Sequence, residues 1–130
     1  MSYLWVGLGG AVGSILRFWL GGLISNTKWG AVFPLGTLVI NITGSLVIGV
    51  FGAMTTPESR FNASWRSLAI QLLMVGLCGG YTTFSSFSLQ TLNLARDGQW
   101  LFAGLNIVLS VGLCLVGVWI GYAIGAIINK

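Results

Sequence analysis

A polar stretch interrupts one of the long apolar segments of this sequence. Residues 79–88 read GGYTTFSSFS, inside the otherwise apolar segment 68–95. Adjacent glycines followed by β-branched and hydroxyl residues disfavour a regular helix. Interrupted helices in membranes form ion sites, because loosened carbonyl groups bind cations and exposed N–H groups bind anions. The alternative is a glycine-softened kink that only packs against another helix.

Two aromatic residues lie within this stretch. Phe84 and Phe87 are three positions apart, so they project from one face of a helix that resumes there. An aromatic ring carries a negative face and a positive edge, and rings turned edge-on can contact a small anion that is partly stripped of water. The spacing by itself favours ordinary packing.

Two other apolar segments carry a stripe of polar residues at four-residue intervals, on one face of each expected helix. The stripes are Thr37, Asn41 and Ser45 in one segment, and Asn106, Ser110 and Cys114 in the other. Polar groups in hydrocarbon are costly, so these faces should meet each other, a partner or a water-filled path. The Asn41 amide cannot be fully satisfied within one helix, and its NH2 group is able to donate to an anion. The same amide could equally join two helices.

One charge lies well inside an apolar segment. Arg17 belongs to the segment 4–24. Its side chain either reaches the membrane interface or lines a vestibule, where a positive charge raises the local anion concentration.

The composition predicts an integral membrane protein. The chain of 130 residues is 55% hydrophobic and 6% charged, whereas soluble domains are about a quarter charged. Its four apolar segments, 4–24, 32–54, 68–95 and 101–128, each reach the roughly 20 residues that span a bilayer. We therefore expect one all-α domain over residues 1–130, with four transmembrane helices and the third broken near mid-membrane.

Several functions are excluded by residue type. The chain has no histidine, and its two carboxylates, Glu58 and Asp97, lie between the apolar segments. Most metal, proton-relay and nucleotide mechanisms lack the groups that they need, so we do not expect an enzyme. The six basic residues are scattered singly, which argues against a nucleic-acid partner.

The basic residues also bear on topology. Orientation normally follows an excess of Lys and Arg in cytoplasmic loops. Here three basic residues fall on each side of the membrane: Arg60, Arg66 and Lys130 against Arg17, Lys28 and Arg96. Such a chain can insert both ways and form an inverted-topology homodimer. The alternative is a single orientation fixed by a partner or by weak local effects.

Glycine stripes mark expected helix contacts. They are Gly9 and Gly13 in the first segment, Gly44 and Gly52 with Ile48 between them in the second, and Gly117, Gly121 and Gly125 in the fourth. Small residues at four-residue intervals permit close backbone approach between helices. We expect packing from them and nothing more.

The motifs together resemble those of one known family. GGYTTFSSFS is similar to the GGxTTFSTFS signature of the Fluc (CrcB) fluoride channels, and PLGTLVINITGS resembles that family's PLGTxxxNxxGS. The opening GLGGAVGSILRFWL, which contains Arg17, resembles the family's glycine-rich first span. The resemblance extends over the whole chain.

The resemblance implies an antiparallel, dual-topology homodimer in the bacterial inner membrane. Such a dimer exports fluoride passively and so lowers its toxicity in the cytoplasm. By position, Phe84 and Phe87 match the phenylalanines that line the pore, Asn41 matches an asparagine of the second span, and Ser110 matches a hydroxyl on the polar track. We add Thr37 and Asn106 as pore candidates, because they extend the two polar stripes.

The resemblance also implies a structural sodium ion at the dimer centre. Gly79 and Thr82 match the residues whose backbone carbonyls hold it, and substitution of Gly79 is expected to disturb the backbone there. Two positions depart from the family: Asn106 replaces a tyrosine of some members, and Gln90 replaces a glutamate of many.

Two alternatives remain open. A small multidrug exporter is also a four-span, dual-topology dimer, but it needs a carboxylate within the membrane to exchange protons. A non-transporting assembly subunit would use its polar stripes only to join helices.

Overall fold

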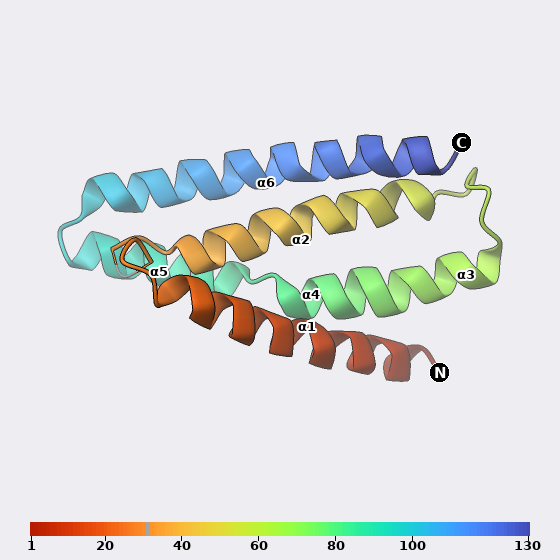
Figure 1. Cartoon of the computed structure of the whole chain (residues 1–130), viewed down its shortest axis with the longest axis horizontal. Helices are drawn as coiled ribbons and strands as arrows, with labels where there is room; N and C mark the ends of the chain where they lie inside the picture. Colours follow the sequence, from red (N-terminus) through yellow and green to blue (C-terminus); the bar gives the residue numbers. More distant parts are fainter. Residues whose placement is uncertain (31) are drawn as a thin grey trace.

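The chain forms four long antiparallel helical segments. The computed structural model describes residues 1–30 and 32–130, and these contain helices and connecting turns but no strand. The elements are α1 (Ser2–Ser25), α2 (Leu35–Met54), α3 (Ala63–Leu68), η1 (Ala69–Cys78), α4 (Gly79–Tyr81), α5 (Phe84–Arg96) and α6 (Trp100–Ile128). Both termini and the α2–α3 connection lie at one end of the molecule (Figure 1). The connections α1–α2 and α5–α6 lie at the other end.

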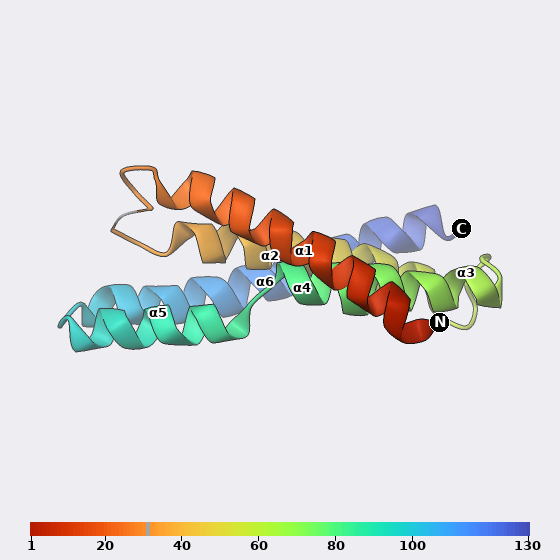
Figure 2. The same cartoon turned by 90° about the horizontal axis from the view of Figure 1, so that it is seen from below.

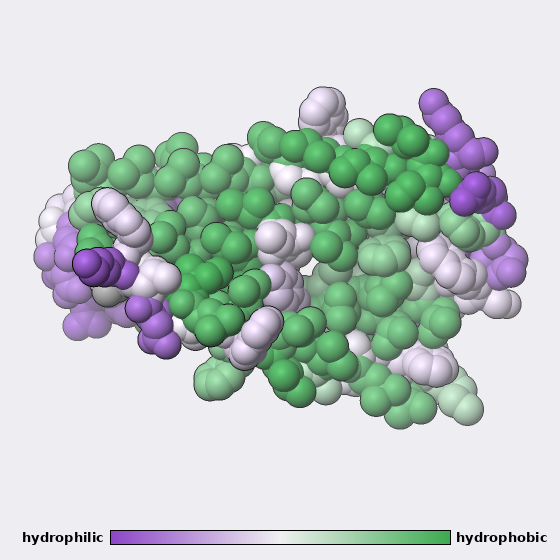
Figure 3. All heavy atoms as spheres, in the orientation of Figure 1, coloured by the Kyte–Doolittle hydropathy of each residue, from purple (hydrophilic) through white to green (hydrophobic). Residues whose placement is uncertain are grey.

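The outer surface fits a membrane. Four segments are long and apolar enough to cross one: Ser2–Ser25, Leu35–Met54, Ala63–Arg96 and Trp100–Ile128. Hydrophilic residues gather at the two ends, and the middle of the face shown in Figure 3 is mostly apolar, with a few pale, weakly polar residues at its centre. Large apolar side chains such as Phe18 and Val108 point outward. The expectation of an all-α protein with four membrane-spanning segments is confirmed.

Helices α2 and α6 pack tightly along their length. A Cβ atom placed on Gly117, Gly121 or Gly125 would press against the backbone of α2. From the other side, a Cβ on Gly49 would press against the carbonyl of Val118. The glycine stripe of α6 is therefore a contact surface, as its spacing predicts.

Helix α1 packs on the third span in the same way. Figure 2 shows α1 crossing α4, and the two are in contact. A Cβ on Gly9 or Gly13 would meet the carbonyls of Leu72 and Leu77, which confirms the predicted stripe. In α2 the prediction holds only in part, since Gly44 is enclosed by Tyr81 and Thr82, but a Cβ on Gly52 would meet only the Tyr122 ring, at 4.0 Å.

The third span consists of several pieces. After α3, residues Ala69–Cys78 wind as a wide π-type helix, η1, which α4 continues in ordinary helical geometry. Thr82 (φ −82°, ψ 158°) and Thr83 (φ −151°, ψ 114°) then have extended backbone, and α5 begins at Phe84. We call Thr82 and Thr83 the extended link.

The extended link corrects one detail of the sequence interpretation. We expected the adjacent glycines to be unwound, yet Gly79 has φ −63° and ψ −38°, and Gly80 also lies within α4. The irregular backbone is limited to two threonines. β-Branched residues fit extended backbone better than helix, and the side-chain oxygen of Thr83 caps the new helix by accepting from Ser86 N–H (3.2 Å).

Candidate functional site

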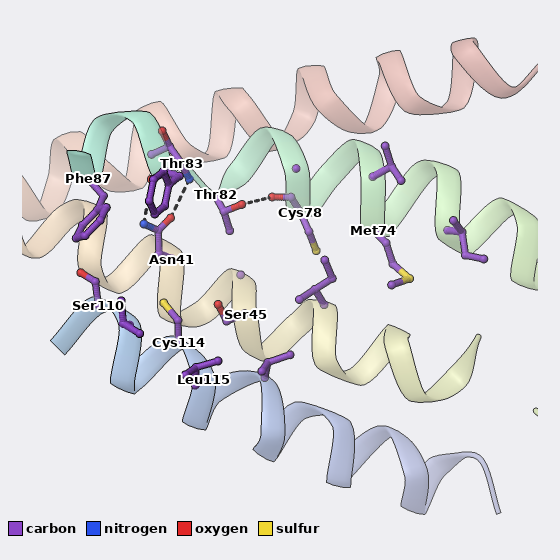
Figure 4. Close-up of a pocket in the computed structure, with 18 residues that line it drawn as sticks. Asn41, Ser45, Met74, Cys78, Thr82, Thr83, Phe87, Ser110, Cys114 and Leu115 are labelled. Atoms are coloured by element: carbon purple, nitrogen blue, oxygen red, sulfur yellow. Dashed lines mark hydrogen bonds between the residues drawn. The ribbon is translucent and has the colours of Figure 1, made fainter. Parts of the chain in front are cut away.

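The extended link borders a groove. The groove has a volume of about 720 Å³ and lies between α2, the third span, the start of α5 and α6 (Figure 4). Apolar side chains make up most of its wall. Its polar lining residues are Asn41, Ser45, Thr82, Thr83 and Ser110, together with the thiols of Cys78 and Cys114. None of the described residues that line it is charged.

Asn41 is paired with the extended link. Its Nδ2 donates to the carbonyl of Thr83 (3.1 Å), and its Oδ1 accepts from the backbone N–H of Thr83 (2.8 Å). These two bonds provide partners for both the N–H and the carbonyl group of Thr83, whose backbone is extended and not helical. An amide NH2 has two hydrogens, so the second N–H of Asn41 remains available. The structure therefore shows Asn41 joining two spans, while one donor is left over for a ligand.

The extended link leaves two carbonyl groups without their helical donors. In a continuous helix, the Gly79 carbonyl would accept from Thr83 N–H and the Thr82 carbonyl from Ser86 N–H. Here Thr83 N–H bonds to Asn41, and Ser86 N–H bonds to the side chain of Thr83. Gly79 and Thr82, the two carbonyl groups assigned to sodium from the sequence, have thus both lost their helical donors.

The two phenylalanines meet at the start of α5. Their ring centroids are 5.3 Å apart and the rings are inclined by 51°. Phe87 is buried, with 8% of its surface exposed, whereas Phe84 is 77% exposed. Both line the groove beside Asn41. The structure thus brings together four of the sequence-predicted pore residues: Asn41, Phe84, Phe87 and Ser110.

Ser110 is part of a hydrogen-bonded chain between α6 and α5. Its hydroxyl donates to Asn106 Oδ1 (3.4 Å), Asn106 Nδ2 donates to Thr91 Oγ1 (2.8 Å), and Thr91 donates to the carbonyl of Phe87 (2.8 Å). Asn106 is only 2% exposed and lies behind the groove wall. The buried amide connects the backbone that carries Phe87 to the serine that lines the groove.

Other candidates lie outside the groove. Thr37 is in the first turn of α2, Arg17 is half-buried on α1, and neither lines the groove. Contact of Thr37, Asn106 or Arg17 with an ion stays a prediction. Gln90 lies on α5, and its buried Oε1 has no hydrogen-bond partner among the described residues.

Two participating residues were not singled out from the sequence. Thr83 supplies both backbone groups that pair with Asn41, and Thr91 links Asn106 to the backbone of Phe87. Thr91 follows Phe87 by four residues, a helical spacing that the sequence does contain. The partner of Asn41, by contrast, depends on how the spans pack.

These features together define a multi-pass helical membrane protein with a polar site between its spans. The family profile described as "CrcB-like protein, Camphor Resistance (CrcB)" matches residues 4–122. The chain belongs to this family, which confirms the family resemblance seen in the motifs.

The chain is similar to proteins that carry the name "Fluoride-specific ion channel FluC". The protein of Rhodospirillum rubrum is 57% identical over all of this chain and 98% of its own length. The proteins of Methylocella silvestris (49%) and Paramagnetospirillum magneticum (51%) also match all of this chain, over 97% and 99% of their own lengths.

Proposed function

We propose that this protein is a fluoride-selective passive channel that lets fluoride leave the cytoplasm. The observation that carries the proposal is the convergence of Asn41, Ser110, Phe84 and Phe87 on one groove, in a chain whose relatives are named as fluoride channels. Hydroxyl and amide groups donate to an anion, and ring edges offer a positive surface to it. The family is one of ion channels, not of enzymes.

The groove also indicates how the protein transports. An exporter driven by protons needs a titratable group on the path. The two carboxylates, Glu58 and Asp97, lie in the α2–α3 connection and just after α5. Since the described residues that line the groove include no Asp, Glu or His, the groove suits passive flow and not proton exchange.

A liposome efflux assay tests this function. Purified protein is reconstituted with internal fluoride, and release is recorded with a fluoride electrode after a potassium ionophore clamps the voltage. We expect rapid fluoride release, very slow chloride release in parallel vesicles, and no need for a proton gradient. Fluoride release at the rate of protein-free vesicles would refute the proposal. Release only with a proton gradient would favour the exporter.

The working unit in this proposal is an antiparallel homodimer in the inner membrane. The groove is open along one side of the single chain, and a hydrated ion path needs walls on all sides. Both termini and the α2–α3 connection lie at one end (Figure 1), so the basic residues divide three against three between the ends. A chain with this balance has no charge signal for a single orientation.

The orientation of the chain in the membrane can be tested by adding positive charges to its connections. Two or three lysines added near Asn26, in the α1–α2 connection, should bias every copy one way and remove fluoride flux. Coexpression with a second copy biased the other way, by lysines in the α2–α3 connection, should restore it. Full activity from one biased form alone would contradict the antiparallel dimer.

A structural sodium ion at the dimer centre completes the proposal. The carbonyl groups of Gly79 and Thr82 have lost their helical donors, and carbonyl oxygens are ligands that suit a hard monovalent cation. Two such carbonyls from each copy would surround one point if the extended links meet at a two-fold axis. The ion would offset the mutual repulsion of these dipoles and hold the copies together. No side chain takes part in binding it.

A further inference from the structure

The donors that line the groove differ in whether their hydrogens are already used. Four hydroxyl groups line it: Ser45, Thr82, Thr83 and Ser110. Thr82 donates to the carbonyl of Cys78 (2.9 Å), Thr83 to Ser86 Oγ (3.1 Å), and Ser110 to Asn106 (3.4 Å). The Ser45 hydroxyl makes no hydrogen bond with any described residue.

This freedom is unusual for a hydroxyl within a helix. Ser and Thr there commonly donate to the carbonyl three or four residues earlier. Thr43, on the same helix, donates to Val39 (2.8 Å), and Thr55 donates to Phe51 (2.8 Å). Ser45 is half-buried, faces the groove and does not bond back to its helix. Its hydrogen is available to whatever enters the groove.

The second free donor lies one helical turn away. Asn41 uses one hydrogen of its NH2 group for the Thr83 carbonyl and keeps the other. Residues four apart on a helix have Cβ atoms about 5–6 Å apart. This spacing is short enough for one small ion lying between the two side chains to be within hydrogen-bond reach of both donors. Figure 4 shows Asn41 and Ser45 on consecutive turns of α2 among the groove-lining side chains.

We propose that Asn41 and Ser45 together form an anion-binding position in the groove, in which the Ser45 hydroxyl is a direct donor to dehydrated fluoride. This inference rests on the proposed fluoride function. The two donors line the same groove as Phe84 and Phe87, so an anion that passes the rings would meet two hydrogens that no described residue uses. A cation cannot accept a hydrogen bond from these donors, so the two hydrogens favour an anion over a cation.

The test compares substitutions on one helix in the liposome efflux assay. Ser45→Ala removes the donor, and Ser45→Cys keeps the size but offers only a weak S–H donor. Thr43→Val is the matched control, because it removes a hydroxyl that already bonds to its own helix and to Tyr81. Initial efflux rate is measured as a function of fluoride concentration, and dimer yield is measured by size-exclusion chromatography.

We expect Ser45→Ala to raise the fluoride concentration for half-maximal flux by about tenfold, since a hydrogen bond to a charged group has that order of effect on affinity. Ser45→Cys should fall between Ser45→Ala and the unmodified protein, and Thr43→Val should match the latter. Dimer yield should not change.

Three results would overturn the inference. An unchanged half-maximal concentration in Ser45→Ala removes Ser45 from the path and leaves the fluoride function intact. Equal losses in Ser45→Ala and Thr43→Val would mean that hydroxyls on α2 matter only for packing. Absence of fluoride efflux from the unmodified protein would end both the proposed function and this inference.

Discussion

The two sides of the third span are built in opposite ways. On the side of α1 the helices meet backbone to backbone, and a single Cβ on Gly9, Gly13 or Gly80 would have no room. On the side of α2 and α6 there is a groove of about 720 Å³, with polar groups on its wall. Close packing without side chains gives a rigid support. The difference shows that the chain fixes one side of the interrupted span and leaves the other side open.

The largest effect is expected from the aromatic residues of the open side. Phe84→Ile or Phe87→Ile keeps apolar volume but removes the positive ring edge. Loss of an interaction of about 1.4 kcal/mol changes a rate tenfold, so we expect fluoride efflux to fall about tenfold or more. The control is Phe18→Ile, because Phe18 is exposed on α1, away from the groove. Unchanged efflux in both groove variants would mean that these rings only pack against their neighbours and do not contact fluoride.

The next effect concerns the pairing between Asn41 and the extended link. Asn41→Asp retains an acceptor for Thr83 N–H but loses the donor to the Thr83 carbonyl, and it can place a negative charge beside an anion path. We expect strongly reduced efflux. Asn41→Ala should also speed hydrogen exchange of the Thr83 amide, measured by NMR in detergent. Normal efflux from Asn41→Asp would show that Asn41 does not line the fluoride path.

Adjacent glycines give a direct comparison of the two sides. A Cβ on Gly80 would press into the backbone of Gly10, whereas a Cβ on Gly79 would meet only the Met74 carbonyl at 4.0 Å. Gly80→Ala should therefore lower the free energy of unfolding by about 1–3 kcal/mol. Gly79→Ala should not lower it, because Gly79 is helical and a Cβ fits there, contrary to the expectation from sequence that Gly79 is needed for the backbone. Chemical denaturation in detergent measures both.

Substitution of Gly79 also distinguishes an effect on the stability of the single chain from an effect on dimer assembly. The residue is exposed in the single chain. If Gly79→Ala keeps its unfolding free energy but yields less dimer, a second copy approaches closely at this position. Equal unfolding free energies for the Gly79 and Gly80 variants would contradict the contrast between the two sides.

The smallest effect is expected at Thr82. Its hydroxyl bonds to the Cys78 carbonyl, which serine can also do, and the methyl group that serine lacks touches Gly44. Thr82→Ser should cost less than about 1 kcal/mol of stability, and efflux should stay near that of the unmodified protein. A large loss of efflux would mean that the side chain, not the carbonyl, has the essential role.

Much of this molecule was predictable from its sequence. Four long apolar segments predict the four spans, and the stripe of Gly117, Gly121 and Gly125 predicts a close contact, because both signals are local and periodic. The two threonines with extended backbone lie within the polar stretch 79–88 that the sequence singles out. The helical backbone of the two glycines was not expected from the sequence, and of the two only Gly80 packs closely against α1.

The polar partners were beyond the sequence. Asn41 and Thr83 are 42 residues apart, and only the packing of α2 against the third span brings them together. The burial of Asn106 was also missed, since its spacing from Ser110 is the same whether the stripe faces a path or another helix. Periodicity identifies the polar face of a helix but not what that face contacts.

The central claim is that this groove conducts fluoride passively and selectively. The most direct measurement is the reversal potential of currents through the reconstituted protein in a planar bilayer, with fluoride, chloride, sodium and proton gradients imposed independently. We expect the reversal potential to follow the fluoride gradient and to be independent of the other three gradients. A reversal potential that follows chloride would contradict selectivity, and one that shifts with the sodium or proton gradient would contradict passive flow.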